Sequence, residues 1–476
     1  MKERQLKRCP TKYENRSSRF FDASLRQTEP ADNAGNGNRD FERRQFFFIY
    51  RSRFDALKKR LQQAASDELT YEATNASTSE PPKICTIPEL QAGQPAVVIG
   101  TLIKKQQLRP SYLKQLSEDI NESIQNVGSV RYIGEEDKLT LEDESQVIQL
   151  QGNIAVDALV TGVTVALFGA TTSKGLFDVS RVLYAPQEPQ RALPETNDDK
   201  YLLFMSGLEI GGDNNEEVDA TFAARLLVDY LSGLLGNERE QQDFTSKIAR
   251  VIVAGNSIKT TQQDREFSRQ ARYILRHKQV PSVQCMRNLD AFLAEMTPIL
   301  PVDLMPGTDD PTNHMLPQAP LHRCMFTKAA DGMFDMDDLL AGLNLVPNPY
   351  HAAVDGCVLL GTSGQNVADV LNNSSLEGPI DALQAILQWQ HLCPTAPDTL
   401  DCTPTTKDPF VMTDECSTPH ILFAGNQEQV AHKLLKDGSG HQTLLLAVPR
   451  FCTTRQVAVV NIRNLQVTPI DLNMFD

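Results

Sequence analysis

The chain has 476 residues, of which 41% are hydrophobic and 22% charged, a composition typical of globular proteins with two or three domains. No apolar run reaches the roughly twenty residues of a membrane-spanning helix and the N-terminus lacks a signal-peptide pattern, so an intracellular, soluble protein without a membrane partner is expected. The formal net charge of -15 argues against a main role in gripping nucleic acid, because neutralising phosphates needs a basic face.

The N-terminal part of the chain is basic, unlike the rest. Residues 1–60 contain sixteen Lys or Arg and eight Asp or Glu, which gives +8, whereas the remaining chain carries -23. Within this part, residues 1–40 are predicted to be a flexible basic extension. Whether the basic residues contact DNA or an import receptor stays open, because clusters such as 58–60 serve either role.

The segment after this extension carries apolar side chains at helical spacing. They are Phe47, Tyr50, Phe54, Leu57 and Leu61. Residues 41–64 are therefore predicted to form an amphipathic helix that docks this stripe on a core. Residues 65–82 are rich in Ser, Thr and Glu and end in two prolines, which predicts a linker.

Residues 83–185 are predicted to be rich in short strands. The run 95–102 has the pattern of a strand, and two hairpins are predicted around the turns 142–145 and 171–175. Five or so short strands in about a hundred residues favour a small Greek-key barrel of the OB type.

An OB-type barrel raises the alternative of single-stranded nucleic acid binding, because many such barrels stack bases on aromatic side chains in a basic groove. In this chain the acidic runs 135–137 and 142–144 would repel phosphate. The charges therefore favour a protein-contact role for the barrel.

A second predicted linker, residues 186–199, leads into a region of alternating strands and helices, residues 200–476. Amphipathic stripes over 222–234 and 285–296 predict two helices that face the core. Strands are predicted at 201–206, 250–254, 301–305, 356–361, 420–424, 442–448 and 456–462. This alternation is typical of a layered α/β domain.

Four segments of this region combine a strand with a tight polar turn, where α/β sheets usually place ligands. They are residues 201–211, 250–256, 302–310 and 421–428. A two-metal hydrolase needs several Asp, Asn and His ligands from such turns to activate water and neutralise the phosphoryl charge. These turns supply too few ligands, so no catalytic residue and no metal site are predicted.

Other candidate groups offer no catalytic site either. Ser363 lies in a glycine turn without the spacing of a nucleophile elbow, and Cys324 and Cys357 are expected to be core thiols. Nine scattered cysteines without a CxxC pair argue against zinc or iron-sulfur clusters. The histidines are expected to be surface or packing residues, since none lies on a ligand-bearing turn. They are His277, His314, His322, His351, His391, His420, His432 and His441.

Five segments of the chain carry longer motifs. They are residues 131–144, 201–211, 302–313, 360–366 and 393–400. These motifs resemble the second, non-catalytic subunits of eukaryotic DNA polymerase delta, which belong to the B-subunit family of replicative polymerases, and the resemblance covers roughly residues 41–470. That family is similar to calcineurin-like phosphoesterases. The resemblance therefore implies an α+β multidomain protein, with an OB-type barrel and a phosphoesterase-like α/β sandwich that lacks metal ligands.

The resemblance also marks the positions where active phosphoesterases hold their metals. Gly207 stands for the first Asp and Glu209 for a His, while Lys259 falls near an acidic position and would repel a metal. Oxygen donors at these turns could still hold a hard cation, an alternative that the missing histidines disfavour. The vestigial positions are Gly207, Glu209, Asn256, Lys259, Thr308, Asp309, Asn426 and Glu428.

By this resemblance the chain is expected to be a nuclear, non-enzymatic scaffold in DNA replication. It would hold the cysteine-rich C-terminal module of the catalytic subunit and the N-terminal part of the third subunit, which in turn contacts the sliding clamp. No cofactor is implied, and DNA is expected to bind at most weakly. The alternatives are an active metallophosphoesterase, a single-stranded-DNA-binding OB protein, and the equivalent small subunit of polymerase alpha or epsilon.

Overall fold

The computed structural model of the chain divides into two units. The sandwich unit comprises Met1–Phe20, Pro189–Gln365 and Cys416–Asp476, and the barrel unit comprises Phe21–Glu188 and Asn366–Glu415. The structure describes residues 8, 11–21, 45–75, 82–109, 131–194, 198–211, 215–235, 238–259, 282–329, 342–413, 418–438 and 440–473. Within these residues no helix is both long and apolar enough to cross a membrane.

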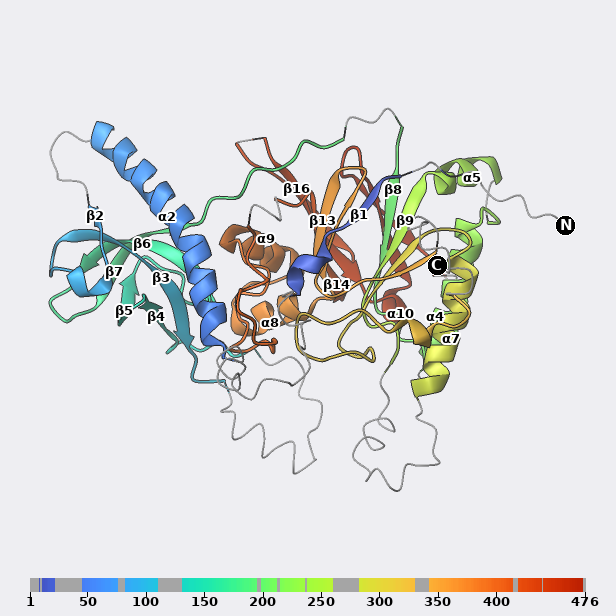
Figure 1. Cartoon of the computed structure of the whole chain (residues 1–476), viewed down its shortest axis with the longest axis horizontal. Helices are drawn as coiled ribbons and strands as arrows, with labels where there is room; N and C mark the ends of the chain where they lie inside the picture. The colour runs from blue at the N-terminus through green and yellow to red at the C-terminus, as the bar shows by residue number, and fades with distance from the viewer. Residues whose placement is uncertain are drawn as a thin grey trace, which may run out of the picture. The chain divides into compact units, whose positions relative to one another are not determined.

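The barrel unit contains a six-stranded sheet in which five strands close into a barrel and β2 adds to the edge of β3 (Figure 1). In sheet order the strands are β2 (Lys83–Ile84), β3 (Pro95–Lys105), β4 (Lys138–Glu142), β5 (Val147–Gly152), β7 (Phe177–Tyr184) and β6 (Thr164–Thr171). β6 also pairs with β3, which closes the sheet on itself. The predicted small barrel is confirmed, and so are both of its hairpins, β4–β5 and β6–β7.

Helix α2 (Phe47–Asn75) packs on the barrel through residues spaced four apart. Ile49, Leu57, Leu61 and Ala65 are fully buried. Side chains at positions i and i+4 lie on one face of a helix, so these four form a single apolar row. The last three of them share a core cluster with the barrel residue Val97.

The prediction of this helix was right, but its bounds and its apolar stripe were partly wrong. The helix begins at Phe47 rather than residue 41, and it continues through residues 65–75 of the predicted linker. Residues 76–81 lie outside the described residues. Phe47 is 60% exposed, whereas Ile49 is buried. Alanine and leucine among the polar residues after position 64 favour a helix, and the high polar content hid that preference.

A fully buried arginine, Arg53, lies on the same face of α2. Its Nε donates to Asp408 Oδ2 over 2.7 Å, while Nη1 and Nη2 donate to the carbonyls of Pro394 and Ala396 over 2.8 and 2.6 Å. His391 Nε2 lies 2.9 Å from the same Asp408 oxygen. Burial, reinforced by the charge of Arg53, lowers the pKa of His391 to about 4. The neutral ring therefore donates a hydrogen bond from Nε2–H to Asp408, since its Nδ1 accepts one from the Cys393 N–H. The network ties α2 to the loop that holds its partners.

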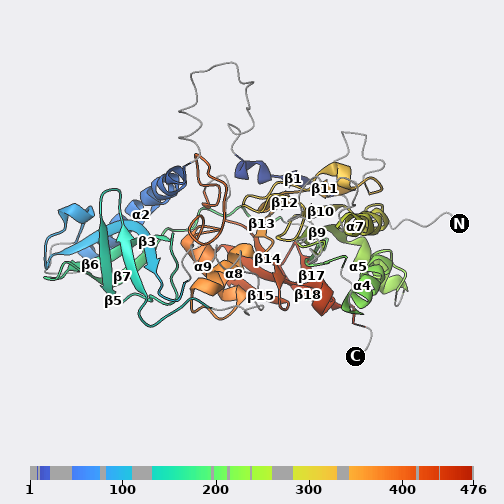
Figure 2. The ribbon, with the colours of Figure 1, turned by 90° about the horizontal axis from the view of Figure 1, so that it is seen from below.

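The sandwich unit consists of two six-stranded sheets (Figures 1 and 2). The first runs β1 (Tyr13–Asn15), β12 (Tyr350–Val354), β13 (Cys357–Thr362), β14 (Ile421–Gln427), β16 (Gln442–Pro449), β15 (Ala431–Lys436). The second runs β11 (Leu343–Leu345), β10 (Val302–Met305), β9 (Ile248–Ala254), β8 (Tyr201–Met205), β17 (Gln456–Asn461), β18 (Val467–Asp471). Every strand predicted in this region is confirmed, whereas β1, β11, β12, β15 and β18 were not predicted.

Side chains of the second sheet alternate between two apolar cores, because successive residues of a strand point to opposite faces. Leu202 and Phe204 of β8 share a core with Phe423 of the first sheet. Leu203 and Met205 belong to the core formed with the helices, which gather on the outer side of this sheet in Figure 2. Those helices are α4 (Asn215–Leu231), α5 (Glu238–Ser246) and α7 (Ser282–Met296). Because both faces of β8 are buried, its sequence is a continuous apolar run, as predicted.

Residues 11–21 correct the prediction of a flexible extension. β1 pairs antiparallel with β12, with Tyr13 opposite Val354. Phe20, in the short helix Ser17–Phe20, is 1% exposed. Tyr13 also stacks on Arg250, whose guanidinium carbon lies 3.7 Å from the ring centre. Apart from residue 8, the rest of the predicted extension lies outside the described residues.

Residues 366–415, predicted as part of a domain spanning 200–476, group with the barrel instead. The segment carries most of α8 (Gln365–Asn373) and all of α9 (Pro379–Trp389). Lys104 of β3 donates from Nζ to the Asn373 carbonyl over 3.0 Å, which ties α8 to the barrel. The sequence did not predict this boundary, because residues 366–415 pack with strands that lie about two hundred residues earlier in the chain.

Candidate functional site

Four strand-end turns of the sandwich unit meet at one place, as the α/β layout predicts. The Gly207 N–H donates to the Gly255 carbonyl over 2.9 Å. A Cβ placed on Gly207 would come within 2.9 Å of Asn426 Oδ1, and one on Gly307 within 2.1 Å of Asn256 Oδ1. The turns after β8, β9, β10 and β14 thus form one contiguous site, called here the turn cluster.

Several residues of the turn cluster have a left-handed backbone. The φ angle is +60° at Gly207 and +84° at Gly255, and it is 48° at Glu209, 53° at Asn256 and 57° at Asn426. Residues other than glycine seldom adopt positive φ, and such residues concentrate where surroundings over-determine the backbone. The contacts among the turns hold these conformations in place.

Glu209 is buried in the turn cluster and paired with two cations. Its exposed fraction is 4%. Arg450 Nε donates to Glu209 Oε1 over 2.8 Å, and Arg450 Nη2 donates to the same oxygen. Lys259 Nζ lies 3.8 Å from Oε2. Burial alone would lower the pKa of Arg450, but the hydrogen bond and charge of Glu209 outweigh it and raise that pKa.

Asp310 joins two of the turns through backbone hydrogen bonds. Its carboxylate accepts from the N–H groups of Gly307 at 2.8 Å, Ser257 at 2.9 Å and Ile258 at 3.1 Å. The side chain is 5% exposed, and burial raises its pKa to about 6. Both carboxylate oxygens are engaged by the backbone, so Asp310 acts as a turn cap.

The other vestigial positions are half-buried or exposed in the turn cluster. Asn256 Oδ1 accepts a hydrogen bond from the Asp309 N–H at 3.4 Å. Asn426 Nδ2 donates to the Ser363 carbonyl over 2.8 Å, so both amides bind neighbouring turns. The exposed positions are Thr308 and Glu428.

Within the described ranges, no group of three or more His, Cys, Asp or Glu side chains is arranged to hold a metal ion. His420 is buried, and its Nδ1 accepts a hydrogen bond from the Val358 N–H over 2.9 Å. His391 belongs to the Arg53 network of the barrel unit. His277 lies outside the described residues.

In the part of the chain that the structure describes, no base forms a hydrogen bond with Ser363 Oγ or with the thiols of Cys324 and Cys357. Ser363 Oγ accepts from Asn348 Nδ2 over 2.8 Å and donates to Gln365 Oε1. Amides do not take up a proton at neutral pH, so this serine is not activated. Burial raises the pKa of Cys357 to about 12. Cys324 is exposed, so its prediction as a core thiol was wrong; the short helix that carries it buries none of its residues.

Arg450 is the site residue that sequence reasoning missed. It lies 241 residues after Glu209, between β16 and the short helix α10 (Phe451–Thr454). The Phe451 N–H donates to the Ser206 carbonyl over 2.8 Å, which brings Arg450 beside the first turn. In the sequence, Arg450 is marked only by its place as a charged residue directly after the apolar strand β16.

The chain matches two family models and several curated relatives. The model described as DNA polymerase delta subunit OB-fold domain matches residues 45–182, and the model of the DNA polymerase alpha/epsilon B subunits matches residues 202–432. The DNA polymerase delta small subunit of Oryza sativa is 37% identical over 391 residues, which are 82% of this chain and 86% of the relative. The chain belongs to the family of DNA polymerase delta small subunits.

Two further members of the delta small-subunit family show how far the similarity reaches. DNA polymerase delta subunit 2 of Drosophila melanogaster is 36% identical over 471 residues, 98% of this chain and 99% of the relative. The small subunit of Saccharomyces cerevisiae is 27% identical over 419 residues, 81% of each chain. The resemblance stated from the motifs is thereby confirmed.

The family models coincide with parts of the two units. The delta OB-fold model covers α2 and the barrel into β7, which confirms the predicted OB-type barrel. The alpha/epsilon model begins in β8 and ends in β15, so it contains the turns after β8, β9, β10 and β14. The four turns of the turn cluster therefore lie within the region that matches the alpha/epsilon B-subunit model.

Replacing Glu209 with glutamine (Glu209→Gln) is expected to destabilise the sandwich unit by about 1–2 kcal/mol, because it removes the charge-assisted hydrogen bonds to Arg450. The exposed side of Arg450 limits the loss, since water can solvate the freed guanidinium. Thermal unfolding followed by circular dichroism measures the change. Glu428→Gln changes an exposed vestigial position. The free energy of unfolding of this variant should lie within about 0.5 kcal/mol of that of the parent protein. Equal effects of the two changes would contradict a structural role for the Glu209 pair.

Proposed function

We propose that the chain is a non-catalytic scaffold of DNA polymerase delta that joins the catalytic subunit to the third subunit during DNA replication. The observation that carries the proposal is the Glu209 ion pair. Arg450 and Lys259 bring two positive charges to the strand-end turns. A phosphoesterase would need two cations bound at such turns.

The physical reason is electrostatic. A metal ion entering the turn cluster would meet the charges of Arg450 and Lys259 at close range, and like charges repel most strongly where water is partly excluded. The carboxylate that could attract the ion, Glu209, already balances one of them. On this proposal the vestigial positions are remnants of a phosphoesterase site, and the sandwich unit no longer hydrolyses phosphate esters.

The charge of the chain supports protein partners over DNA. With a net charge of -15, the chain offers acidic and neutral surface to other subunits and leaves phosphate contacts to a basic partner. We place the chain in the nucleus, with the cysteine-rich C-terminal module of the catalytic subunit and the N-terminal part of the third subunit as its direct partners. The sliding clamp is reached through the third subunit, and DNA binds at most weakly.

Co-expression of the tagged chain with the catalytic and third subunits of the same organism tests this function. All three subunits are expected to co-purify in equal amounts at moderate salt, and omission of this chain should leave the other two unassociated. The purified chain alone should not hydrolyse a phosphodiester in Mn²⁺ or Mg²⁺. Failure to retain the catalytic subunit, or metal-dependent hydrolysis, would overturn the proposal.

A further inference from the structure

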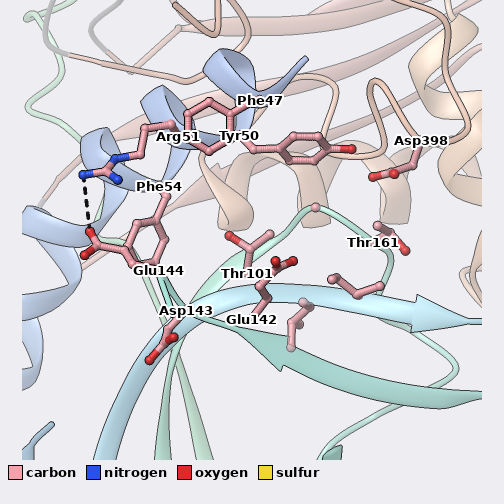
Figure 3. A pocket seen from close by; sticks show the side chains of 13 residues that line it. Phe47, Tyr50, Arg51, Phe54, Thr101, Glu142, Asp143, Glu144, Thr161 and Asp398 are labelled. Atoms are coloured by element: carbon pink, nitrogen blue, oxygen red, sulfur yellow. Dashed lines mark ion pairs between the residues drawn. The ribbon is translucent and has the colours of Figure 1, made fainter. Parts of the chain in front are cut away.

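Within the barrel unit, a groove of about 410 Å³ lies between α2 and the barrel (Figure 3). Phe47, Tyr50 and Phe54 line it from α2, and Thr101 lines it from β3. Phe47 is 60% exposed, in contrast to the buried residues of the neighbouring helix face. Exposed aromatic surface beside a concavity of this size is typical of a binding site rather than of a solvated face.

The rim of the groove is acidic. Glu142, Asp143, Glu144 and Asp398 line it, against a single cation, Arg51. Arg51 is already paired with two carboxylates. Its Nε lies 3.1 Å from Asp55 Oδ2. Its Nη2 lies 3.8 Å from Glu144 Oε1, the ion pair drawn in Figure 3. The groove therefore carries an excess of negative charge.

The four carboxylates differ in what they already bind. Asp143 caps the β4–β5 hairpin, accepting hydrogen bonds from the N–H groups of Ser145 and Gln146 at 2.7 and 2.8 Å. Glu144 Oε1 lies 3.1 Å from Lys58 Nζ. For the exposed side chain of Glu142, no hydrogen bond or ion pair occurs in the part of the chain that the structure describes. Glu142 is thus the carboxylate that can receive a cation from outside.

We propose that this groove docks a segment of another polymerase subunit in which an apolar side chain lies next to a lysine or arginine. The apolar side chain contacts Phe47 and Tyr50, and the cation pairs with Glu142. Because Asp398 accepts a hydrogen bond from the Tyr50 hydroxyl, it adds negative charge at the same aromatic wall. The inference rests on the proposed function, which supplies the other subunits.

Charge and size decide the kind of occupant. Carboxylates on the rim repel phosphate, so a nucleic acid strand is a poor match for the aromatic wall despite its stacking potential. An acidic segment would be repelled in the same way. A cavity of this volume holds one or two side chains, which suits the anchor of a short polypeptide segment.

Site-specific cross-linking identifies the occupant directly. The photoreactive p-benzoylphenylalanine is introduced at Phe47 in the full chain, the chain is assembled with the catalytic and third subunits, and the cross-linked peptides are identified by mass spectrometry. A peptide of another subunit with a Lys or Arg beside an apolar residue is expected. The matched control places the same group at Tyr71, which is 73% exposed and lies about 36 Å farther along α2. It should not yield that peptide.

Charge reversal in the groove measures its contribution to assembly. Glu142→Lys is expected to weaken binding of the chain to its partner subunit about tenfold, with an effect that shrinks as salt is added. Glu135→Lys makes the same change at an exposed residue of the barrel unit that does not line the groove, and it should change the affinity less than twofold. Circular dichroism checks that both variants fold.

The outcomes separate this inference from the proposed function. If the parent chain fails to co-purify with the other subunits, the proposed function fails. If the parent chain assembles, but Glu142→Lys behaves like Glu135→Lys, the docking groove is wrong and the scaffold function stands. Cross-links from position 47 only to this chain, to a second copy of it, or to nothing would likewise overturn the groove.

Discussion

Replacing Arg53 with methionine (Arg53→Met) is expected to destabilise the barrel unit by about 3–5 kcal/mol. Methionine keeps much of the side-chain length but removes the guanidinium that balances the buried Asp408 carboxylate. Three backbone carbonyls, those of Gly162, Pro394 and Ala396, lose a donor at the same time. Urea unfolding followed by the fluorescence of Trp389, the single tryptophan of the chain, measures the barrel unit directly.

Arg51→Met is the matched control on the same helix. Arg51 is about half exposed and pairs with Asp55 at 3.1 Å, so its removal should cost less than about 1 kcal/mol. If the unbalanced charge of Asp408 causes the loss, adding Asp408→Asn to Arg53→Met should recover part of it. An Arg53→Met variant as stable as Arg51→Met would contradict the role assigned to the buried network.

Replacing Gly255 with alanine (Gly255→Ala) is expected to destabilise the sandwich unit by about 3 kcal/mol or more. Two costs combine. The φ angle of +84° disfavours any side chain by roughly 1–2 kcal/mol. The added Cβ would also lie 2.4 Å from Ser363 Cβ, and such overpacking costs about 1–3 kcal/mol. Hydrogen exchange of the peptides that contain β8 and β9 reports the opening of this unit.

Gly356→Ala separates the two costs. Gly356 also has a positive φ, +89°, but a Cβ there would meet no atom within 4 Å. Its replacement should therefore show the backbone cost alone, about 1–2 kcal/mol. Trp389 fluorescence should be unchanged in both variants, since that residue belongs to the barrel unit. Equal losses in the two variants would mean that the turns have room to separate.

The strands of the sandwich unit could be predicted because they are continuous apolar runs. β8 buries both Leu203 and Phe204 on opposite faces, so its sequence has no polar interruption. Edge strands were missed for the opposite reason: β15 exposes most of its residues and has little apolar signal. Phe54, Leu57 and Leu61 of the predicted α2 stripe are buried, but its first turn was wrong: Phe47 is exposed, and the buried residues there are Ile49 and Arg53. The burial of Arg53 depends on an ion pair that no hydropathy pattern reveals.

The sequence predicted where the turns of the turn cluster lie, but it did not predict the ion pair between Glu209 and Arg450. Glycines after apolar strands indicated where the turns lie, and the parallel order of β8, β9 and β10 brings them together. The partner of Glu209 could not be inferred, since Arg450 comes from a strand end more than two hundred residues away. Long-range ion pairs depend on sheet order, which local sequence does not specify.

The interleaving of the two units constrains how the protein is made. β8 pairs with β17, with Phe204 opposite Ala458, while the barrel unit is finished by residues up to Glu415. A chain still emerging from the ribosome therefore exposes an unpaired edge of β8 until β17 has been synthesised. Unpaired strand edges favour aggregation, so we expect a truncated product that lacks β17 to aggregate more readily than the whole chain.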